Sequence, residues 1–131
     1  MKKLKGWFIM FIIPLSIFGM TACSGGGNNS YEQITPEQAK TIMDTESEYI
    51  IIDARTDEEF AEGHIKDAIL IPEYEIADRA EKELPDKGGL ILVYCRSGRR
   101  SKIASEELVK LGYTNVKEFG GIIDWPYDVV K

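Results

Sequence analysis

The sequence predicts an α/β fold in which a mostly parallel central sheet carries helices on both faces. The expected strands at residues 49–53 and 90–94 are apolar throughout except for Asp53 at the end of the first, a pattern typical of strands buried on both faces. Segments with helix-capping signals separate the expected strands, and this alternation favours parallel pairing through helical crossovers. Ligands bind beyond the carboxyl ends of the strands in such sheets, so the residues that follow each strand are the candidates for function.

The first 22 residues predict an export signal. A basic stretch precedes an apolar run at residues 7–20, which is shorter than the roughly 20 residues that a membrane-spanning helix needs. Residues 20–23, Met-Thr-Ala-Cys, resemble a bacterial lipoprotein box, which implies that Cys23 becomes the lipidated first residue of the mature chain. Residues 23–30 are then expected to comprise the lipidated cysteine and a flexible tether, and the domain of residues 31–131 is expected to be extracytoplasmic and lipid-anchored to a bacterial membrane. The alternatives are an uncleaved anchor and an ordinary signal peptide.

Capping and turn signals predict the elements of the domain in order. A candidate edge strand at residues 31–34 is followed by Thr35, which caps a helix with Pro36 in its first position and Gln38 three residues after the cap. This helix is expected to run to about residue 43, and the strand at residues 49–53 follows it. Next come a short helix at 57–62 closed by Gly63, a strand at 68–71 stopped by Pro72, and a charged helix at 74–84. The strand at 90–94 is followed by a helix at 101–111, which Gly112 ends. A last strand at 115–119 leads through Gly120 and Gly121 into a closing turn or helix.

The strand at residues 90–94 delivers Cys95 into a short loop, and Ser101 is expected to open the next helix. The thiol then faces the positive end of a helix dipole. Gly98 permits a curl of the backbone that turns successive N–H groups inward, and these groups together with the loop arginines favour a thiolate. A thiolate in this setting can attack a sulfur donor and hold the transferred atom as a persulfide. The candidate residues of the active loop, besides Cys95, are Arg96, Ser97, Gly98, Arg99, Arg100 and Ser101.

Several short motifs are dispersed along residues 31–131: Asp53-Ala54-Arg55, Glu59-Phe60, Gly63-His64-Ile65, residues 68–72, Cys95-Arg96-Ser97-Gly98-x-Arg100-Ser101, and Gly120-Gly121 followed by Trp125. In their types and their order, these motifs resemble those of the rhodanese family. Asp67 stands where glycine is usual in the family, and Leu70 stands where asparagine is usual. The resemblance implies a sulfurtransferase in which Cys95 carries the persulfide. The expected donor is a small sulfur-containing anion such as thiosulfate or polysulfide, and the acceptor is a thiol, cyanide or a protein.

Four alternatives compete with sulfur transfer. Cys95 could be an inert buried cysteine, or the domain could be a non-catalytic module that binds sulfur species or a partner protein. The related phosphatase and arsenate-reductase loops place an arginine six positions after the cysteine, where this chain has Ser101, and Arg100 comes only five positions after Cys95. A shorter loop suits a single sulfur atom better than a tetrahedral oxyanion, so these two activities are disfavoured.

Several residues outside the loop admit more than one role. Asp53 could pair with a loop arginine and fix the shape of the loop, or it could form a salt bridge that only stabilises the fold. Arg55 is a candidate to line the pocket. His64 is expected to be a structural hydrogen-bonding residue rather than a general base. The aromatic side chains near the C-terminus are expected to pack in the core or at its rim.

Composition narrows the partners. The formal net charge is −6, and because the three lysines among the first 22 residues are not matched by acids, the remainder carries −9, which argues against nucleic acid. One histidine and two distant cysteines do not make a metal site, so neither a metal nor another cofactor is expected. If Cys23 is lipidated, Cys95 has no partner for an intrachain disulfide, and the sulfur must leave to an external acceptor. The domain is expected to be a monomer.

Overall fold

The computed structural model describes residues 30–131. Cys23 and the whole predicted signal peptide lie outside the described residues. Within the described part of the chain, no helix is both long and apolar enough to cross a bilayer.

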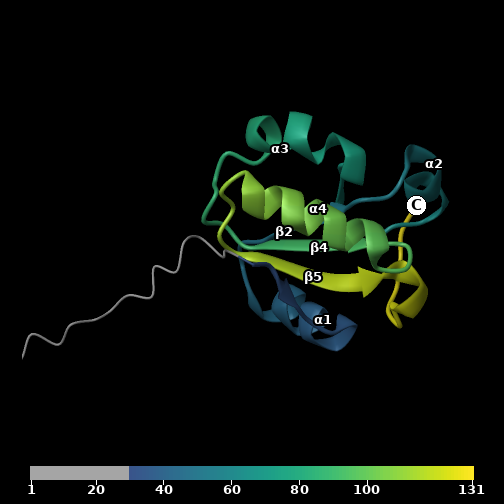
Figure 1. Ribbon diagram of the computed structural model, residues 1–131. Coiled ribbons are helices and arrows are strands. Elements are labelled where there is room, and N and C mark those ends of the chain that lie inside the picture. The colour runs from purple at the N-terminus through teal and green to yellow at the C-terminus, as the bar shows by residue number, and fades with distance from the viewer. Residues whose placement is uncertain (1–29) are drawn as a thin grey trace, which may run out of the picture.

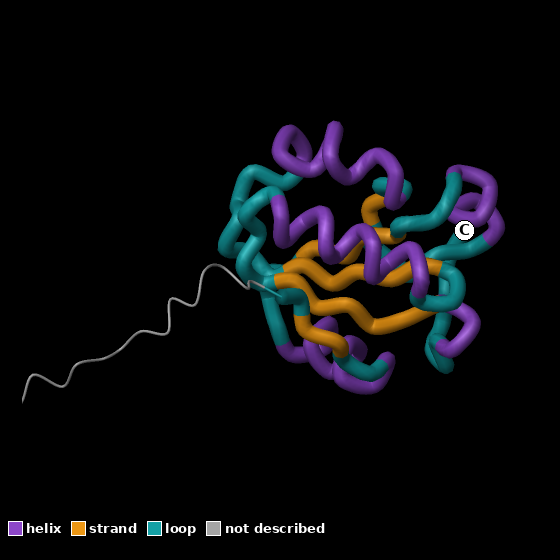
Figure 2. Tube along the Cα trace, viewed as in Figure 1, coloured by secondary structure: helices purple, strands orange, loops and turns teal. Residues whose placement is uncertain are grey.

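A parallel sheet of five strands forms the centre of the molecule (Figures 1 and 2). The strand order is β1-β5-β4-β2-β3, and every neighbouring pair is parallel. The strands comprise β1 (Glu32–Gln33), β2 (Ile50–Asp53), β3 (Ile69–Leu70), β4 (Ile91–Cys95) and β5 (Val116–Gly121). The predicted α/β fold with a mostly parallel sheet is confirmed.

Helices cover both faces of this sheet. Helix α1 (Pro36–Thr45) packs on one face, whereas α3 (Ile76–Glu83) and α4 (Arg99–Lys110) pack on the other (Figure 1). The short helix α2 (Asp57–Glu62) lies near the carboxyl ends of the strands. Two 3₁₀ turns, η1 (Glu73–Glu75) and η2 (Ile122–Asp124), complete the chain.

The pleat of β4 divides its side chains between two apolar cores. Val93 and Cys95 face the core beneath α3 and α4. Ala104 and Leu108 of α4 belong to this core. Tyr94 faces the other core, beneath α1. Successive side chains of a strand point to opposite faces, so a strand buried on both faces needs the continuous apolar run seen in the sequence.

Two helix predictions were wrong at their boundaries. Helix α4 begins at Arg99, two residues before the predicted start at Ser101, because Gly98 adopts a left-handed conformation with φ of 108° and ends the loop there. The helix expected at residues 74–84 is divided into the turn η1 and the helix α3, which begins at Ile76. The first change matters for the site, since it moves Arg99 and Arg100 from the loop into the first turn of a helix.

Candidate active site

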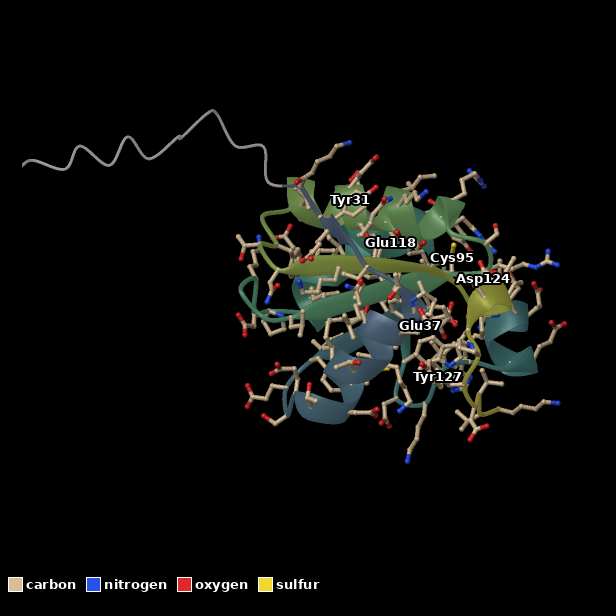
Figure 3. All side chains as sticks on the ribbon, turned by 90° about the horizontal axis from the view of Figure 1, so that it is seen from below. Tyr31, Glu37, Cys95, Glu118, Asp124 and Tyr127 are labelled. Carbon is tan, nitrogen blue, oxygen red and sulfur yellow. The ribbon has the colours of Figure 1, made fainter. Side chains whose placement is uncertain are left out.

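Cys95 is the last residue of β4, between β2 and β5 in the sheet (Figure 3). Its side chain is free and buried. The backbone N–H of Gly98 donates a hydrogen bond to the sulfur over 3.0 Å, and α4 begins at the next residue. The predicted position of the thiol, at the carboxyl end of a buried strand and beside a helix N-terminus, is confirmed. Partial positive charge from the N–H groups of that first turn favours negative charge on the sulfur.

The loop after Cys95 is fastened to the segment that follows β5. The N–H of Ile123 donates to the carbonyl oxygen of Arg96 over 3.2 Å. Gly121 lies so close beneath this carbonyl that an added Cβ would stand 1.9 Å from the oxygen, so only glycine fits there. The paired glycines noted in the sequence therefore allow the close approach of two backbones at the site.

A bulge in β5 produces that approach. Val93 aligns with Glu118, whereas Cys95 aligns with Gly121, so β5 contains one residue more than β4 between these pairs. Gly120 lies in the bulge with φ of 89°, a conformation that glycine adopts without strain.

The three arginines that follow Cys95 have different surroundings. Arg96 and Arg99 are exposed. Arg100 instead forms two parallel hydrogen bonds to the carboxylate of Glu59 on α2, over 2.7 and 2.9 Å. These bonds hold the pKa of Glu59 at about 2, against the opposing effect of partial burial. Arg100 therefore ties the start of α4 to α2, and its guanidinium is engaged with a carboxylate.

Ser101 and Glu118 form a buried polar pair beside the sulfur that we did not predict from the sequence. The Oγ atom of Ser101 lies 3.3 Å from the sulfur of Cys95 and 2.6 Å from Oε1 of Glu118. Only 3% of Glu118 is exposed. A signal for this pair was present in the strand pattern: Val116 and Glu118 alternate onto one face of β5, and an acid on an apolar face needs a polar partner.

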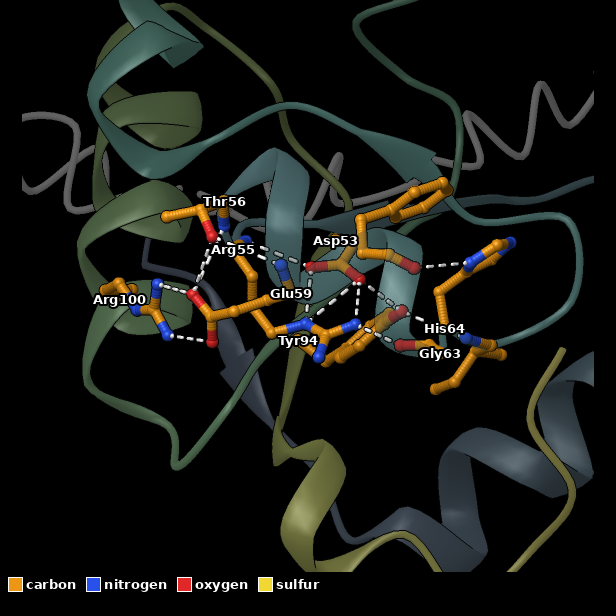
Figure 4. A network of polar contacts seen from close by, with 10 residues as sticks. Asp53, Arg55, Thr56, Glu59, Gly63, His64, Tyr94 and Arg100 are labelled. Carbon is orange, nitrogen blue, oxygen red and sulfur yellow. Dashed lines mark hydrogen bonds and ion pairs between the residues drawn. The ribbon is translucent and has the colours of Figure 1, made fainter. Parts of the chain in front are cut away.

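Asp53 does not bind a loop arginine; it binds Arg55, two residues along the chain (Figure 4). Nη2 of Arg55 lies 2.7 Å from the Asp53 carboxylate, and the same guanidinium nitrogen donates to the carbonyl oxygen of Gly63 over 2.6 Å. The hydroxyl of Tyr94 donates to Asp53 over 2.6 Å and accepts the N–H of Ile65 over 3.0 Å. The salt bridge is buried, with 6% and 0% of the two side chains exposed. Asp53 thus joins the ends of β2 and β4 to the segment after α2.

Arg55 and Tyr94 both keep their protons in this network. Burial lowers the pKa of Arg55, but the hydrogen bond and charge of Asp53 outweigh it and leave that pKa raised. Burial, followed by the charge of Asp53, raises the pKa of Tyr94 far above its usual range, so the phenol remains a hydrogen-bond donor. Among the sequence candidates, Asp53 is thereby placed in a structural network.

His64 has the structural surroundings that we expected. Its ring stacks on Phe60 with 3.7 Å between centroids, and Nδ1 lies 3.0 Å from the carbonyl oxygen of the same residue. Its backbone pairs with Val130 near the C-terminus. Phe119 and Trp125 pack together in the core beneath α1. These residues hold the end of the chain against the sheet.

Two surface hollows flank the active loop. One, of about 430 Å³, is lined by Arg55, Arg96 and Ile123 together with acids of α2. The other, of about 400 Å³, includes Ser97 and Gly98 in its wall and Glu118 at its inner side. Within residues 30–131, no three His, Cys, Asp or Glu side chains are grouped as a metal ion requires. The geometry therefore offers one nucleophilic sulfur with exposed cations at its rim.

Comparisons with known proteins agree on one family. Residues 35–126 match the family model of the rhodanese-like domain. The chain is 40% identical over 80 residues to thiosulfate sulfurtransferase PspE of Escherichia coli, a match that covers 61% of this chain and 77% of that protein. A match to the adenylyltransferase and sulfurtransferase of Candida albicans is 34% identical and covers 74% of this chain but only 24% of that protein. The solved structure of a rhodanese with anions from E. coli aligns with a TM-score of 0.60 and 38% identity, covering 63% of this chain and 98% of the other.

Proposed function

Because this chain belongs to the family of rhodanese-like domains and is a rhodanese-type sulfurtransferase, we propose that it transfers sulfane sulfur through a persulfide on Cys95. The observation that carries the proposal is the environment of the Cys95 sulfur. It accepts the N–H of Gly98 at the very start of α4, where negative charge on sulfur is stabilised. The same environment suits a persulfide, whose outer sulfur also carries a negative charge.

The proposed reaction has two displacements. The Cys95 thiolate attacks the outer sulfur of thiosulfate, the S–S bond of the donor breaks, and sulfite leaves with the bonding electron pair. A nucleophilic acceptor, such as cyanide or a thiolate, then attacks the outer sulfur of the persulfide. The new S–S bond to Cys95 breaks in this second step, and the thiolate is regenerated.

Arg96 and Arg99 are the proposed receptors for the anionic part of the donor. Both are exposed beside the loop, whereas Arg100 is held by Glu59 and cannot close a ring around a tetrahedral oxyanion. This assignment favours sulfur transfer over phosphatase or arsenate-reductase chemistry, which needs such a ring. Replacing both exposed arginines by alanine should raise KM for thiosulfate and weaken its dependence on salt, with little change in kcat.

Mass spectrometry of the intact protein tests the persulfide. Incubation of the purified protein with thiosulfate should add the mass of one sulfur atom, and cyanide or a thiol should remove it. A Cys95→Ser variant is the matched control and should stay unmodified. Failure of every sulfane donor to load the wild-type protein, together with turnover of a phosphate ester or arsenate, would show that the proposed reaction is wrong. Failure to load or turn over any substrate, with tight binding of a protein, would instead favour a non-catalytic module.

We also propose that Cys23 is lipidated and anchors the domain outside the cytoplasm. The support is the sequence alone: a basic start, an apolar run and Met-Thr-Ala-Cys at residues 20–23. Cells fed labelled palmitate should incorporate the label into the wild-type chain and not into a Cys23→Ser variant. Release of unlabelled wild-type protein into the soluble secreted fraction would exclude the anchor.

A further inference from the structure

The polar chain behind Cys95 ends on a buried carboxylate. The thiol of Cys95 donates toward Oγ of Ser101 over 3.3 Å, and the Ser101 hydroxyl donates to Glu118 over 2.6 Å. Cys95, Ser101 and Glu118 are 1%, 0% and 3% exposed. The three groups thus form a continuous donor–acceptor sequence inside the protein, and it begins at the nucleophile.

The direction of these hydrogen bonds depends on which acceptor the single hydroxyl hydrogen of Ser101 binds. The hydroxyl has two other acceptors in reach, the carbonyl oxygens of Gly98 at 3.0 Å and Gly120 at 3.4 Å, but Glu118 is the nearest. A carboxylate is also the strongest acceptor of the three, because hydrogen bonds to charged groups are shorter and stronger than neutral ones. While Ser101 donates to Glu118, its oxygen is available to accept the S–H of Cys95.

We propose that Glu118 takes up the proton of the Cys95 thiol through the hydroxyl of Ser101, an inference that rests on the proposed sulfur transfer by a Cys95 thiolate. The S–H bond breaks and its proton binds Oγ of Ser101, while the original O–H proton of Ser101 binds Oε1 of Glu118. The electron pair of the S–H bond stays on sulfur. A neutral thiol and a carboxylate thereby become a thiolate and a neutral carboxylic acid, and the total charge does not change.

Glu118 is a positioning residue in this scheme, since it acts on sulfur only through Ser101. The N–H of Gly120 also donates to Oε1 of Glu118, over 2.8 Å, and fixes the orientation of the carboxyl group. In Figure 3, Glu118 lies on β5 between Tyr31 and Cys95. A structural role for Glu118, limited to holding the bulge at Gly120, is the competing explanation that an experiment must separate.

The other ionisable groups near Cys95, Ser101 and Glu118 do not interrupt the hydrogen bonds that join these three residues. Burial, with the charges of Glu106 and Glu118, raises the pKa of Tyr31, so this phenol stays neutral beside the carboxylate. Arg100 interacts electrostatically with Cys95 from the first turn of α4. The remaining groups line the hollow on the outer side of Glu118, and they are Lys102 of α4 and Asp124 of η2.

The pH dependence of Cys95 alkylation by iodoacetamide tests the inference on the purified full-length protein, because this reagent consumes the thiolate. A Glu118→Gln variant keeps an oxygen that can accept from Ser101 and Gly120 but cannot take up the proton. At pH 6, Glu118→Gln should be alkylated about tenfold more slowly than the wild type, or slower still. This minimum is a modest demand, because a positioned general base commonly contributes a factor of about 100 or more. The two rates should converge near pH 10, where hydroxide removes the thiol proton directly.

The sign of the change separates the explanations. A rate that rises in Glu118→Gln would show that the carboxylate acts only by repelling the thiolate, and the inference would be wrong. Superimposable profiles, or a loss that is equal at every pH, would indicate a structural role and would also overturn it. Glu106→Gln is the matched control, because it removes a nearby exposed acid that takes no part in the hydrogen bonds from Cys95 to Glu118. The pH profile of its alkylation should equal that of the wild type.

Variants of the bridging residue complete the test. Ser101→Ala should lose the rate at low pH as Glu118→Gln does, and the double variant should lose no more than either single variant. Ser101→Thr keeps the hydroxyl and should restore the rate. Sulfur loading from thiosulfate is measured in parallel: a persulfide with an unchanged alkylation profile would refute this inference alone, whereas the expected profile without any persulfide would refute the proposed function alone.

Discussion

Replacing Asp53 by alanine should be among the most destabilising single substitutions in the domain. The carboxylate is fully buried and accepts hydrogen bonds from the backbone N–H and the guanidinium of Arg55 and from the hydroxyl of Tyr94. Its removal leaves a buried guanidinium without its counter-ion. Breaking a buried ion pair in this way costs about 3–5 kcal/mol, a large part of the roughly 5–15 kcal/mol that stabilises a typical domain.

Thermal and urea unfolding followed by circular dichroism measure this cost. A loss of about 3 kcal/mol should lower Tm by at least roughly 12 °C in a domain of this size. Glu48→Ala removes an exposed acid in the loop before β2 and is the matched control, with an expected change below about 0.5 kcal/mol. In the double variant with Arg55→Ala, part of the loss should return, because the uncompensated charge is removed as well.

The same variant shows whether Asp53 serves only the fold or also sulfur transfer. If Asp53 serves the fold, Asp53→Ala should load sulfur from thiosulfate at nearly the wild-type rate, once the rate is corrected for the folded fraction at low temperature. A loss of stability below about 1 kcal/mol would refute the reasoning from burial and hydrogen bonding. A stable variant that loads sulfur more than about tenfold slower would assign Asp53 to catalysis instead.

Three further predictions concern the loop and a turn. The hydrogen bonds from Arg100 lower the pKa of Glu59 to about 2, so this pair should stabilise the fold fully above about pH 4.5 and progressively less as the pH falls toward 2; in urea titrations between pH 2 and 6, Glu59→Gln should flatten that dependence. Gly121→Ala should reduce sulfur loading by at least about tenfold while the protein stays folded, because its Cβ would stand 1.9 Å from the carbonyl oxygen of Arg96 and must displace the loop, and a normal loading rate would contradict the fit described for this glycine. Asp67 has a positive φ of 68°, so Asp67→Val should cost about 1–2 kcal/mol in urea unfolding whereas Asp67→Gly should not destabilise, and equal costs would exclude backbone strain as the cause.

Local signals in the sequence were sufficient for most elements. Thr35 and Gln38 form the capping box that their spacing predicted, and α2 spans the residues that were expected for it. The start of α4 was missed because Ser101 has the side chain of a common helix cap, whereas Gly98 caps the helix through its backbone conformation. At residue 67, by contrast, the sequence already showed that Asp67 stands where the family usually has glycine. The positive φ of Asp67 explains that preference, because glycine adopts such a conformation without strain.

The contacts that shape the site join residues too far apart in sequence for pattern reasoning to pair them. Arg100 meets Glu59, and Tyr94 meets Asp53, each across 41 residues. A salt bridge between Asp53 and a loop arginine was equally reasonable from the sequence, because both lie at carboxyl ends of adjacent strands. Only the three-dimensional arrangement shows that Arg55 already occupies that carboxylate.

The site has a buried part around the sulfur of Cys95 and an exposed part that carries two arginines. Inside, one N–H and one hydroxyl contact the sulfur of Cys95, which is enough for a single atom but not for the several oxygens of a phosphate or arsenate. Outside, the side chains of Arg96 and Arg99 are exposed, and the proposed function assigns them to the charged part of the donor. Substitutions in the interior should therefore change the rate of sulfur transfer, and substitutions at the rim should change the affinity for the donor.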